Sequence, residues 1–304
     1  MEAKSLSIHL TDCCNSSCIF CVVNSHKNST ECVDKKVIEK FLRDNRKLGY
    51  EAVNIHGGEP TVCKELPLLL DKIKEYGYKF VSLQTNARLM SDIEYAKTLI
   101  GKGIKKYVIS LHGDTDGLHD SITLSPDSFK QTVQGIKNLK KLKDVNTKLM
   151  TNTVACKQNY KSLTKIARKA IDIGIEHINL SAVHTKNRAL YNFNSVVPRY
   201  TVIKPYIIEM VEYVVANNVP ISLEGFPYCA LPGCEDYIVK RDLCKIKLLF
   251  HSILMTDYRD YMDQEQKKQH EKCQKCVYAD ICGGVYEEYQ DRFGWDEFSP
   301  IVRC

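Results

Sequence analysis

Short apolar runs rich in β-branched residues alternate along the chain with longer segments whose apolar residues recur at helical spacing. The runs predicted as strands span residues 5–10, 52–55, 80–83, 107–111, 149–154 and 177–180. The segments predicted as helices span residues 35–48, 66–76, 92–102, 128–143, 160–173 and 203–217. Strands separated by helices indicate a parallel α/β array rather than a sandwich. In such arrays, ligand-binding groups follow the C-terminal ends of the strands.

The alternating pattern stops after Pro220, and cysteine becomes frequent from there onward. The cysteines of this region are Cys229, Cys234, Cys244, Cys273, Cys276, Cys282 and Cys304. We therefore predict two parts, an α/β core over residues 1–219 and a small Cys-rich region over residues 220–304. The length of 304 residues and the 44% share of hydrophobic residues suit one large domain with an appendage.

Fourteen cysteines are far more than a chain of this length ordinarily carries. The N-terminus, Met1-Glu2-Ala3-Lys4, has no apolar signal region, so clustered cysteines favour metal binding in a reducing compartment over disulfides. We expect a cytoplasmic protein with no membrane partner, because no apolar run approaches the roughly 20 residues of a membrane span. The formal charge of +6 is mild for this size and argues against nucleic acid as a partner.

Three cysteines, Cys14, Cys18 and Cys21, form a C-x3-C-x2-C triplet directly after the first predicted strand. Thiolates select iron–sulfur or zinc sites, and three of them can hold a cubane cluster while its fourth iron stays open to a ligand. Cys13 is adjacent to Cys14 and would point elsewhere, so we interpret it as structural. On spacing alone, a zinc knuckle or three unrelated buried thiols are alternatives.

A second motif, Gly57-Gly58-Glu59-Pro60, follows the second predicted strand, and Phe20 precedes the third cysteine of the triplet. With these residues the chain resembles the radical S-adenosylmethionine (radical SAM) superfamily. The resemblance implies that the triplet ligates a catalytic 4Fe–4S cluster and that Gly57, Gly58 and Glu59 meet the amino group of SAM. It also implies a partial (β/α)6 TIM-type barrel, open on one side, in which SAM is cleaved reductively to a 5′-deoxyadenosyl radical.

Polar residues close the later predicted strands. Asn86 follows the third strand and Ser110 ends the fourth, in a stretch that resembles a pattern of part of the superfamily. On that likeness both residues contact SAM, Ser110 at the ribose, and Phe20 helps to build the same site. Asn152 and Asn179, in the fifth and sixth strands, face the same mouth if the barrel prediction holds. A helix cap or a turn is the alternative role for such residues.

The Cys-rich region resembles the auxiliary-cluster tail called SPASM, or its shorter form, twitch. The likeness rests on the spacing Cys273-x2-Cys276-x5-Cys282 and on Pro227-Tyr228-Cys229, which resembles the point where such tails supply an earlier ligand. It implies one auxiliary 4Fe–4S cluster held by four thiolates. These are Cys229, Cys273, Cys276 and Cys282.

Two other assignments of these cysteines stay open. In one, Cys304 closes the auxiliary cluster and leaves Cys229, Cys234 and Cys244 for another. The longer SPASM pattern has a cysteine where Tyr286 stands, which counts against two fully ligated auxiliary clusters. In the other, the cysteines bind a zinc ion with all four positions filled, which stabilises a loop-rich subdomain and has no redox role.

Relatives with auxiliary clusters modify peptide side chains, while others act on aminoglycosides, nucleosides and sugars. We expect a radical SAM oxidoreductase or maturase of a peptide natural product (RiPP maturation), acting by cross-linking, oxidation or epimerisation. The alternatives are a dehydrogenase or epimerase of a sugar, aminoglycoside or nucleoside, and a non-catalytic metal-binding regulator. Epimerisation needs a hydrogen donor, for which Cys156 and Cys63 are candidates, although buried structural thiols explain both more simply.

The expected partners follow from the same resemblance. It implies a reductant such as flavodoxin or ferredoxin and a peptide or small-molecule substrate. The first predicted strand begins almost at Met1, which leaves no room for an N-terminal peptide-recognition module. We therefore expect a separate protein to recognise a peptide substrate.

Overall fold

The computed structural model describes residues 3–25, 32–240, 244–251, 253–262 and 266–302. One nine-stranded sheet runs through these ranges in the order β7-β6-β5-β4-β3-β2-β1-β8-β9. Its strands are β1 (Ala3–His9), β2 (Ala52–His56), β3 (Phe80–Thr85), β4 (Lys106–Ser110), β5 (Lys148–Ala155), β6 (His177–Ala182), β7 (Ile221–Glu224), β8 (Cys244–Phe250) and β9 (Ile253–Met255). Neighbouring strands are parallel except for the antiparallel pair β8 and β9.

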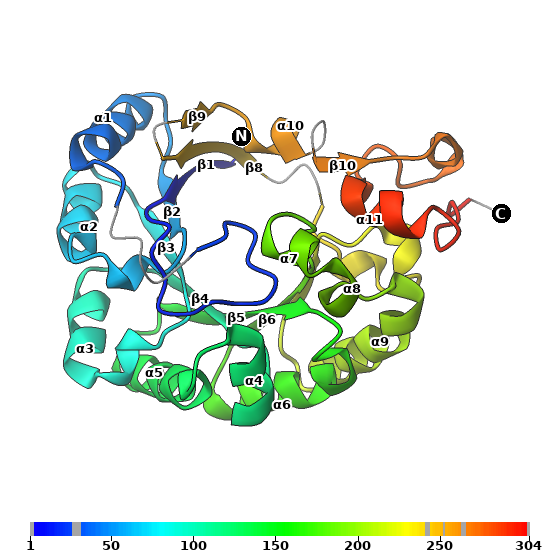
Figure 1. The fold of residues 1–304 in the computed structure, drawn as a ribbon. Helices are drawn as coiled ribbons and strands as arrows, with labels where there is room; N and C mark the ends of the chain where they lie inside the picture. The colour runs from blue at the N-terminus through cyan, green and yellow to red at the C-terminus, as the bar shows by residue number, and fades with distance from the viewer. Residues whose placement is uncertain (1–2, 26–31, 241–243, 252, 263–265, 303–304) are drawn as a thin grey trace.

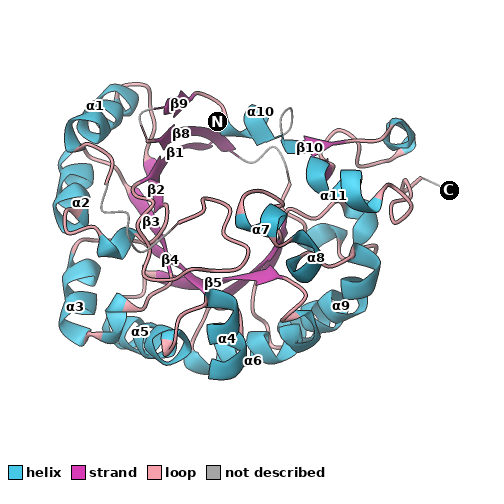
Figure 2. Ribbon diagram, in the orientation of Figure 1, coloured by secondary structure: helices cyan, strands magenta, loops and turns pink. Residues whose placement is uncertain are grey.

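The sheet curves around a central space, and the long helices lie on its outer side (Figure 1 and Figure 2). Because β7 and β9 end the strand order at opposite edges, the α/β barrel is open on one side, as the sequence predicts. The long helices are α1 (Lys35–Arg46), α2 (Leu66–Glu75), α3 (Ile93–Gly101), α4 (Asp116–Thr123), α5 (Ser128–Leu142), α6 (Leu163–Ile173) and α9 (Tyr200–Ala216). The shorter elements are α7 (Arg188–Tyr191), α8 (Phe193–Val196), α10 (Tyr258–Tyr261), α11 (Glu287–Phe293), β10 (Lys267–Lys268) and β11 (Val285–Tyr286).

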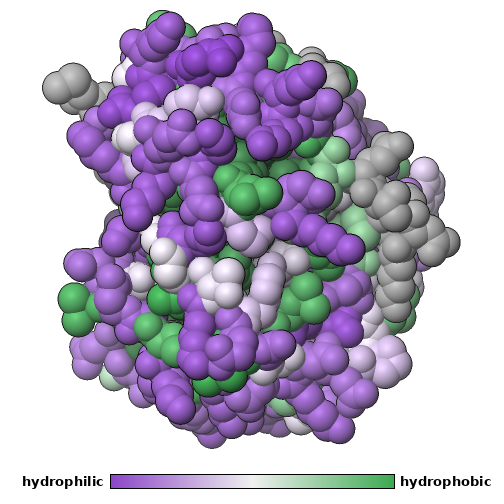
Figure 3. Space-filling model, turned by 90° about the vertical axis from the view of Figure 1, so that its left-hand side faces the viewer, coloured by the Kyte–Doolittle hydropathy of each residue, from purple (hydrophilic) through white to green (hydrophobic). Residues whose placement is uncertain are grey.

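The helices cover the sheet with one apolar stripe each, as α6 illustrates. Leu163, Ile166, Ala170 and Ile173 recur at helical spacing and are buried in the core. Gly174 ends the helix at φ +101°, a left-handed conformation that glycine adopts without steric cost. The opposite faces of such helices are polar, and the side of the molecule that carries α1, α2 and α3 is largely hydrophilic (Figure 3). Among the described residues, no helix combines the length and the apolar character needed to cross a membrane.

The two faces of the sheet differ in chemistry. Leu6 and Ile8 of β1 are completely buried in the core, whereas the intervening Ser7 belongs to the other face. That face is polar across neighbouring strands, since Asn54 Nδ2 donates to Ser7 Oγ at 3.4 Å and Ser82 Oγ donates to Asn54 Oδ1 at 2.8 Å. The barrel therefore has an apolar outer face under the helices and a polar inner face.

The region after Pro220 contributes to this sheet, which the sequence pattern does not predict. β7 extends the β6 edge, and β8 pairs in parallel with β1 over seven residues, from Ala3 opposite Cys244 to His9 opposite Phe250. The prediction that the α/β pattern stops at Pro220 is therefore wrong, because two sheet edges were open to strands from the end of the chain. The division into two domains, residues 1–219 and residues 220–304, stays a prediction. The sheet is continuous across that boundary.

Candidate functional site

The cysteine triplet lies in the loop that follows β1, which we call the cluster loop (residues 10–25). This loop crosses the central space at the end where the parallel strands terminate, drawn in dark blue in Figure 1. Cys14 is buried, and Cys18 and Cys21 are partly exposed. The backbone N–H of Ser16 points at Cys14 Sγ (3.3 Å) and that of Ser25 at Cys21 Sγ (3.4 Å). Such N–H groups stabilise a thiolate, which is the form that binds metal.

The three thiols influence one another through their charges. Burial, reinforced by the carboxylate of Glu59 and the sulfur of Cys21, raises the pKa of Cys14 to about 12. Burial and the two other sulfurs also raise the pKa of Cys18. Three such thiols can ionise together only beside a strongly positive group, as a metal cluster provides.

The chemistry of the triplet suits a metal centre. Three thiols on one loop are a donor set that fits a cubane iron–sulfur cluster with its fourth iron open to a ligand. A zinc ion also accepts thiolate ligands, so a zinc knuckle stays the alternative.

Two arginines and two asparagines fix the cluster loop to the barrel, and the sequence carries no local sign of them. Arg88 Nη1 donates to Ser16 Oγ at 3.1 Å and also to the carbonyl of Asn15. Arg188, the first residue of α7, donates to Asn24 Oδ1 at 3.0 Å and to the carbonyl of Ser25. The side chains of Asn187 and Asn192 donate to further carbonyls of the loop. The loop thus has its position set by residues far away in the sequence.

The Gly-Gly turn after β2 packs against the cluster loop. A Cβ on Gly57 would lie 2.5 Å from the Thr11 carbonyl oxygen, and one on Gly58 would lie 2.3 Å from the Cys13 carbonyl oxygen. The backbone N–H of Gly58 donates to Thr11 O (2.6 Å), and that of Glu59 donates to Cys13 O (2.8 Å). The sequence predicts close approach to a ligand, and the structure adds a second cause, because these glycines let two loops of the chain meet.

Glu59 is buried, and its carboxylate already accepts four hydrogen bonds. The donors are the N–H and hydroxyl of Thr61 (3.1 and 2.6 Å), the hydroxyl of Thr85 (2.6 Å) and the N–H of Asn86 (2.6 Å). Burial raises the pKa of Glu59, and these hydrogen bonds oppose the shift. Glu59 therefore joins the loops after β2 and β3, and its predicted contact with the SAM amino group stays a prediction.

The other predicted SAM residues lie around the same end of the barrel. The ring of Phe20 is buried and packs edge-on against His112, with centroids 4.9 Å apart. Asn86 donates to Asn15 Oδ1 in the cluster loop at 2.6 Å. Ser110 is half-buried at the end of β4, and its hydroxyl makes no hydrogen bond to another described residue. Of the three, Ser110 has the polar group most available to a ligand.

A row of polar residues crosses the inner face from Ser110 to β7. The strand register places Ser110 beside Asn152, Asn152 beside Asn179, and Asn179 beside Ser222. Asn179 Nδ2 donates to Asn152 Oδ1 at 2.9 Å and to Glu224 Oε2 at 3.0 Å. Asn152 and Asn179 are thus neighbours on one face of the sheet, although they lie within β5 and β6 rather than at the ends of these strands. Their contact with SAM or substrate stays a prediction. Glu224, which the sequence analysis missed, adds an exposed carboxylate to this row.

The two candidate hydrogen donors differ in the structure. Cys63 forms a disulfide with Cys32, so the prediction of a free Cys63 thiol is wrong, since a disulfide has no S–H to donate. The sequence analysis favours metal binding over disulfides for the clustered cysteines and predicts no pairing of Cys63 with Cys32, which lies 31 residues away in the chain. Cys156 is completely buried in the core, and burial raises its pKa to about 11. Its role as a donor stays a prediction.

A second thiol site lies in the Cys-rich region, which we call the tail cavity. It is a pocket lined by the four cysteines of the preferred auxiliary set together with aromatic side chains. These lining residues include Cys229, Cys273, Cys276, Cys282, Tyr228, Trp295 and Phe298. Burial, followed by the charges of Cys282, Cys273 and Cys276, raises the pKa of Cys229 to about 12. Four thiols that line one pocket are a donor set that fits either a 4Fe–4S cluster or a zinc ion.

The other cysteines considered as ligands of the auxiliary cluster either lie away from the tail cavity or have side chains that the structure does not describe. Cys234 is buried, does not line the tail cavity, and has glutamates rather than thiols as its charged neighbours. The backbone of Cys244 pairs with Ala3 in the sheet, and its side chain is not described. Cys304 lies outside the described residues. Tyr286, at the position of the missing SPASM cysteine, is buried and stacks on His184 with centroids 4.7 Å apart.

Comparison with known families and sequences identifies the family to which the barrel belongs. A family model described as "Radical SAM superfamily" matches residues 8–170, which is more than half of the 304 residues. Two curated relatives are called "Probable GTP 3',8-cyclase". The Sulfurisphaera tokodaii protein is 29% identical over 60% of this chain and 56% of its own length. The Saccharolobus solfataricus protein is 30% identical over 60% and 57%, respectively. The chain thus matches little more than half the length of these relatives.

Solved structures resemble nearly the whole chain. Streptococcus suis SuiB bound to precursor peptide SuiA has a TM-score of 0.68 at 16% identity, covering 98% of this chain and 74% of SuiB. Native anSMEcpe with bound AdoMet and Cp18Cys peptide has a TM-score of 0.65 at 17% identity, covering 97% of this chain and 92% of that one. At such identities the likeness establishes the fold, an open α/β barrel followed by the tail.

Proposed function

Because the chain belongs to the radical SAM superfamily, we propose that it cleaves SAM in the barrel and uses an auxiliary 4Fe–4S cluster in the tail cavity to oxidise a peptide substrate. When bound, the catalytic cluster and SAM supply a 5′-deoxyadenosyl radical that removes a hydrogen atom from the substrate. The auxiliary cluster supplies an acceptor for the electron that a substrate radical loses on oxidation.

In the barrel, the cysteine triplet holds the catalytic cluster. The N–H groups of Ser16 and Ser25 stabilise the thiolates, and Arg88 and Arg188 keep the loop in place. Phe20, the turn from Gly57 to Glu59, and Asn86 surround the methionyl part of SAM in this proposal. The free hydroxyl of Ser110 is available to the ribose.

The main support for an auxiliary cluster is that four thiols line one cavity. Cys229 comes from the segment after β7, whereas the other three come from the last part of the chain. Four thiolates close every ligand position of a cluster, so such a centre transfers electrons without binding substrate. Tyr228, Trp295 and Phe298 form an aromatic wall of the cavity, and an apolar surrounding of this kind influences the potential of a cluster.

Two observations support a peptide as substrate. SuiB and anSMEcpe, whose folds match both barrel and tail, have been solved with peptides bound. The inner face also offers donors and acceptors for peptide groups at Asn152, Asn179 and Glu224. The exposed Glu224 carboxylate lies near Tyr258, whose pKa is raised to about 12 by burial and, to a smaller extent, by the charge of Glu224. A basic side chain or an amino terminus would complement it.

A nucleotide substrate is the second candidate, and the sequence relatives favour it. Both are called GTP 3',8-cyclases and match 60% of this chain. Ribose-deuterated GTP decides between the candidates. Deuterium that arrives in 5′-deoxyadenosine from GTP would overturn the peptide proposal, and its absence during active SAM cleavage would leave the peptide proposal standing.

The first experiment uses anaerobically purified, reconstituted protein. Iron and sulfide are counted per chain, and 5′-deoxyadenosine formation from SAM under dithionite is measured beside the Cys14→Ala/Cys18→Ala/Cys21→Ala variant. We expect about eight irons in the parent, four for each cluster, and SAM cleavage only in the parent. About four irons with intact cleavage would overturn the auxiliary cluster. A full iron content without cleavage would favour a metal-binding regulator.

A further inference from the structure

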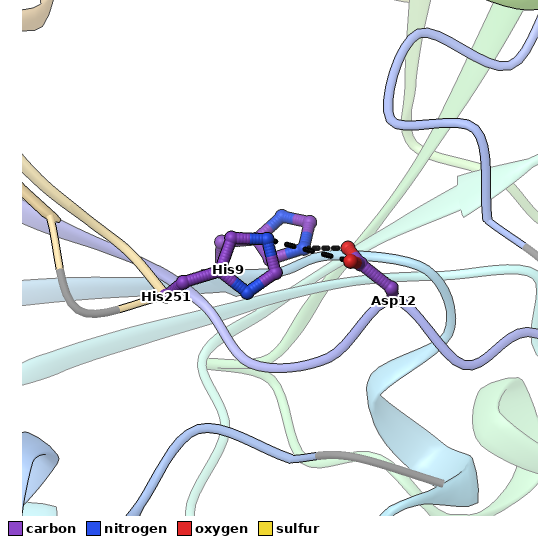
Figure 4. A group of neighbouring side chains, drawn as sticks. All are labelled: His9, Asp12 and His251. Atoms are coloured by element: carbon purple, nitrogen blue, oxygen red, sulfur yellow. Dashed lines mark hydrogen bonds and ion pairs between the residues drawn. The ribbon is translucent and has the colours of Figure 1, made fainter. Parts of the chain in front are cut away.

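A third group of metal-ligating side chains lies beside the cluster loop, and nothing above uses it. His9 ends β1, Asp12 follows in the cluster loop, and His251 directly follows β8, the strand that pairs with β1. Figure 4 shows both imidazoles turned toward the Asp12 carboxylate. His9 Nε2 lies 2.7 Å from Asp12 Oδ1, and His251 Nε2 lies 3.4 Å from Asp12 Oδ2.

The group consists of one carboxyl group and two imidazoles. In the described part of the chain, the ion pairs of Asp12 go to these two histidines, and no Lys or Arg accompanies them. One member of the group, His9, is completely buried.

The donor atoms have the spacing of a first coordination shell. One donor atom from each residue lies within 4.8 Å of the other two. Nitrogen and oxygen ligands of zinc, at about 2.0–2.2 Å from the metal in tetrahedral geometry, lie about 3.4 Å apart. The distance of 3.4 Å from His251 Nε2 to Asp12 Oδ2 equals that value. His9 Nε2 lies 2.7 Å from the other carboxylate oxygen, Oδ1, which is a hydrogen-bond distance that a bound ion would lengthen.

The backbone supports this geometry at a cost. His251 adopts φ +54°, a left-handed conformation that non-glycine residues seldom adopt. Its ring lies 5.2 Å from that of His9. Side chains held in such conformations are common at ligand sites, where the surrounding structure maintains the strain.

We propose that His9, Asp12 and His251 bind a divalent first-row transition metal ion, with Zn²⁺ as the expected occupant. Two imidazoles and one carboxylate are ligands that zinc accepts. Three protein ligands leave a coordination position open, and the side chains of Asp12 and His251 are 32% and 45% exposed, so water or a substrate oxygen can reach the ion. The ion joins β8 to the cluster loop.

The test measures zinc separately from iron in the reconstituted protein. The holoprotein is dialysed anaerobically against micromolar Zn²⁺, and both metals are counted per chain. We expect one zinc in the parent, and at least about a tenfold loss of zinc affinity in Asp12→Asn and in His251→Gln, since each removes one ligand. His177→Gln is the matched control, because this inner-face imidazole bonds to Ser222 outside the group.

X-ray absorption at the zinc edge identifies the ligands. Nitrogen and oxygen neighbours with imidazole scattering support the proposal, whereas sulfur neighbours would place the zinc on cysteines and overturn it. Zinc binding that is unchanged in both variants, or no zinc bound at all, also overturns it and leaves a hydrogen-bonded group. Asp12→Asn lies near Cys14 in the chain and can disturb the cluster, which a loss of iron would reveal. His251→Gln then decides the matter.

Discussion

The cluster loop and the tail cavity both gather cysteines, but the chain holds the two groups in different ways. The cluster loop carries three thiols and is fixed by polar contacts from distant segments, such as Arg88 and Arg188. The tail cavity carries four thiols and is walled by aromatic rings, with Tyr228 stacked on Tyr278 at 4.4 Å between centroids. Three ligands with polar supports suit a centre that exchanges a ligand, whereas four ligands in an aromatic wall suit a closed centre.

The largest expected difference between the two regions concerns SAM cleavage. In Cys273→Ala/Cys276→Ala, we expect cleavage uncoupled from turnover to remain above about a tenth of the parent rate, because the two sites share no ligand. Product formation from a true substrate should be lost. Chromatographic measurement of 5′-deoxyadenosine, beside the triple-alanine variant of the cluster loop, checks this. Equal loss in both variants would mean that the tail is needed for folding, and the division of roles would be wrong.

Glycine replacements probe the same contrast without touching a thiol. A Cβ at Gly58 would lie 2.3 Å from Cys13 O, and one at Gly284 would lie 2.2 Å from Lys268 O. Because backbone must move in each case, we expect each alanine to cost about 1–3 kcal/mol. Gly58→Ala should lose the barrel iron, and Gly284→Ala should lose the tail iron.

Gly117 provides the matched control for these variants. It lies in α4, and a Cβ added there would meet no atom within 4 Å, so alanine at this position should leave the iron content unchanged. Iron counts and thermal unfolding of the three variants give the comparison. Loss of both iron populations in Gly284→Ala would show that the tail and barrel are one cooperative unit.

Local patterns in the sequence predicted most of the barrel. The strand predicted over 149–154 is β5, Lys148–Ala155, and the helix predicted over 35–48 is α1, Lys35–Arg46. Both elements have periodicities that a short window reveals. The four cysteines of the tail cavity were grouped by the resemblance to auxiliary-cluster tails, and the structure brings them to one pocket.

The sequence patterns did not predict contacts between segments that are distant along the chain. β8 pairs with β1 although some 240 residues separate them, and nothing in its own sequence names that partner. The same holds for Arg188 on the cluster loop and for the Cys32–Cys63 disulfide. A signal did exist for His9 and Glu224, since both end strands of a parallel array, where ligand groups gather.

The smallest expected effect is on acid sensitivity. It compares two buried histidines of the barrel, one near the cluster loop and one in contact with the tail. Burial lowers the pKa of His119, near the cluster loop, to about 4, and likewise lowers the pKa of His184, which stacks on Tyr286 of the tail, to about 4. The unfolded chain, with ordinary histidine pKa values near 6.5, binds more protons than the fold between those limits. Stability therefore falls as the pH drops from about 6.5 toward 4.

Each histidine should contribute about 1 kcal/mol to the stability lost between about pH 7 and pH 5.5. His119→Gln and His184→Gln should each reduce that loss by this amount, which urea unfolding at the two pH values measures. The difference between variant and parent cancels the acid sensitivity of the clusters themselves. If the tail unfolds before the barrel, His184→Gln will shift only the first transition and His119→Gln only the second. A single transition shifted by both would make the two regions one folding unit, and an unchanged loss in either variant would contradict the depressed pKa of that histidine.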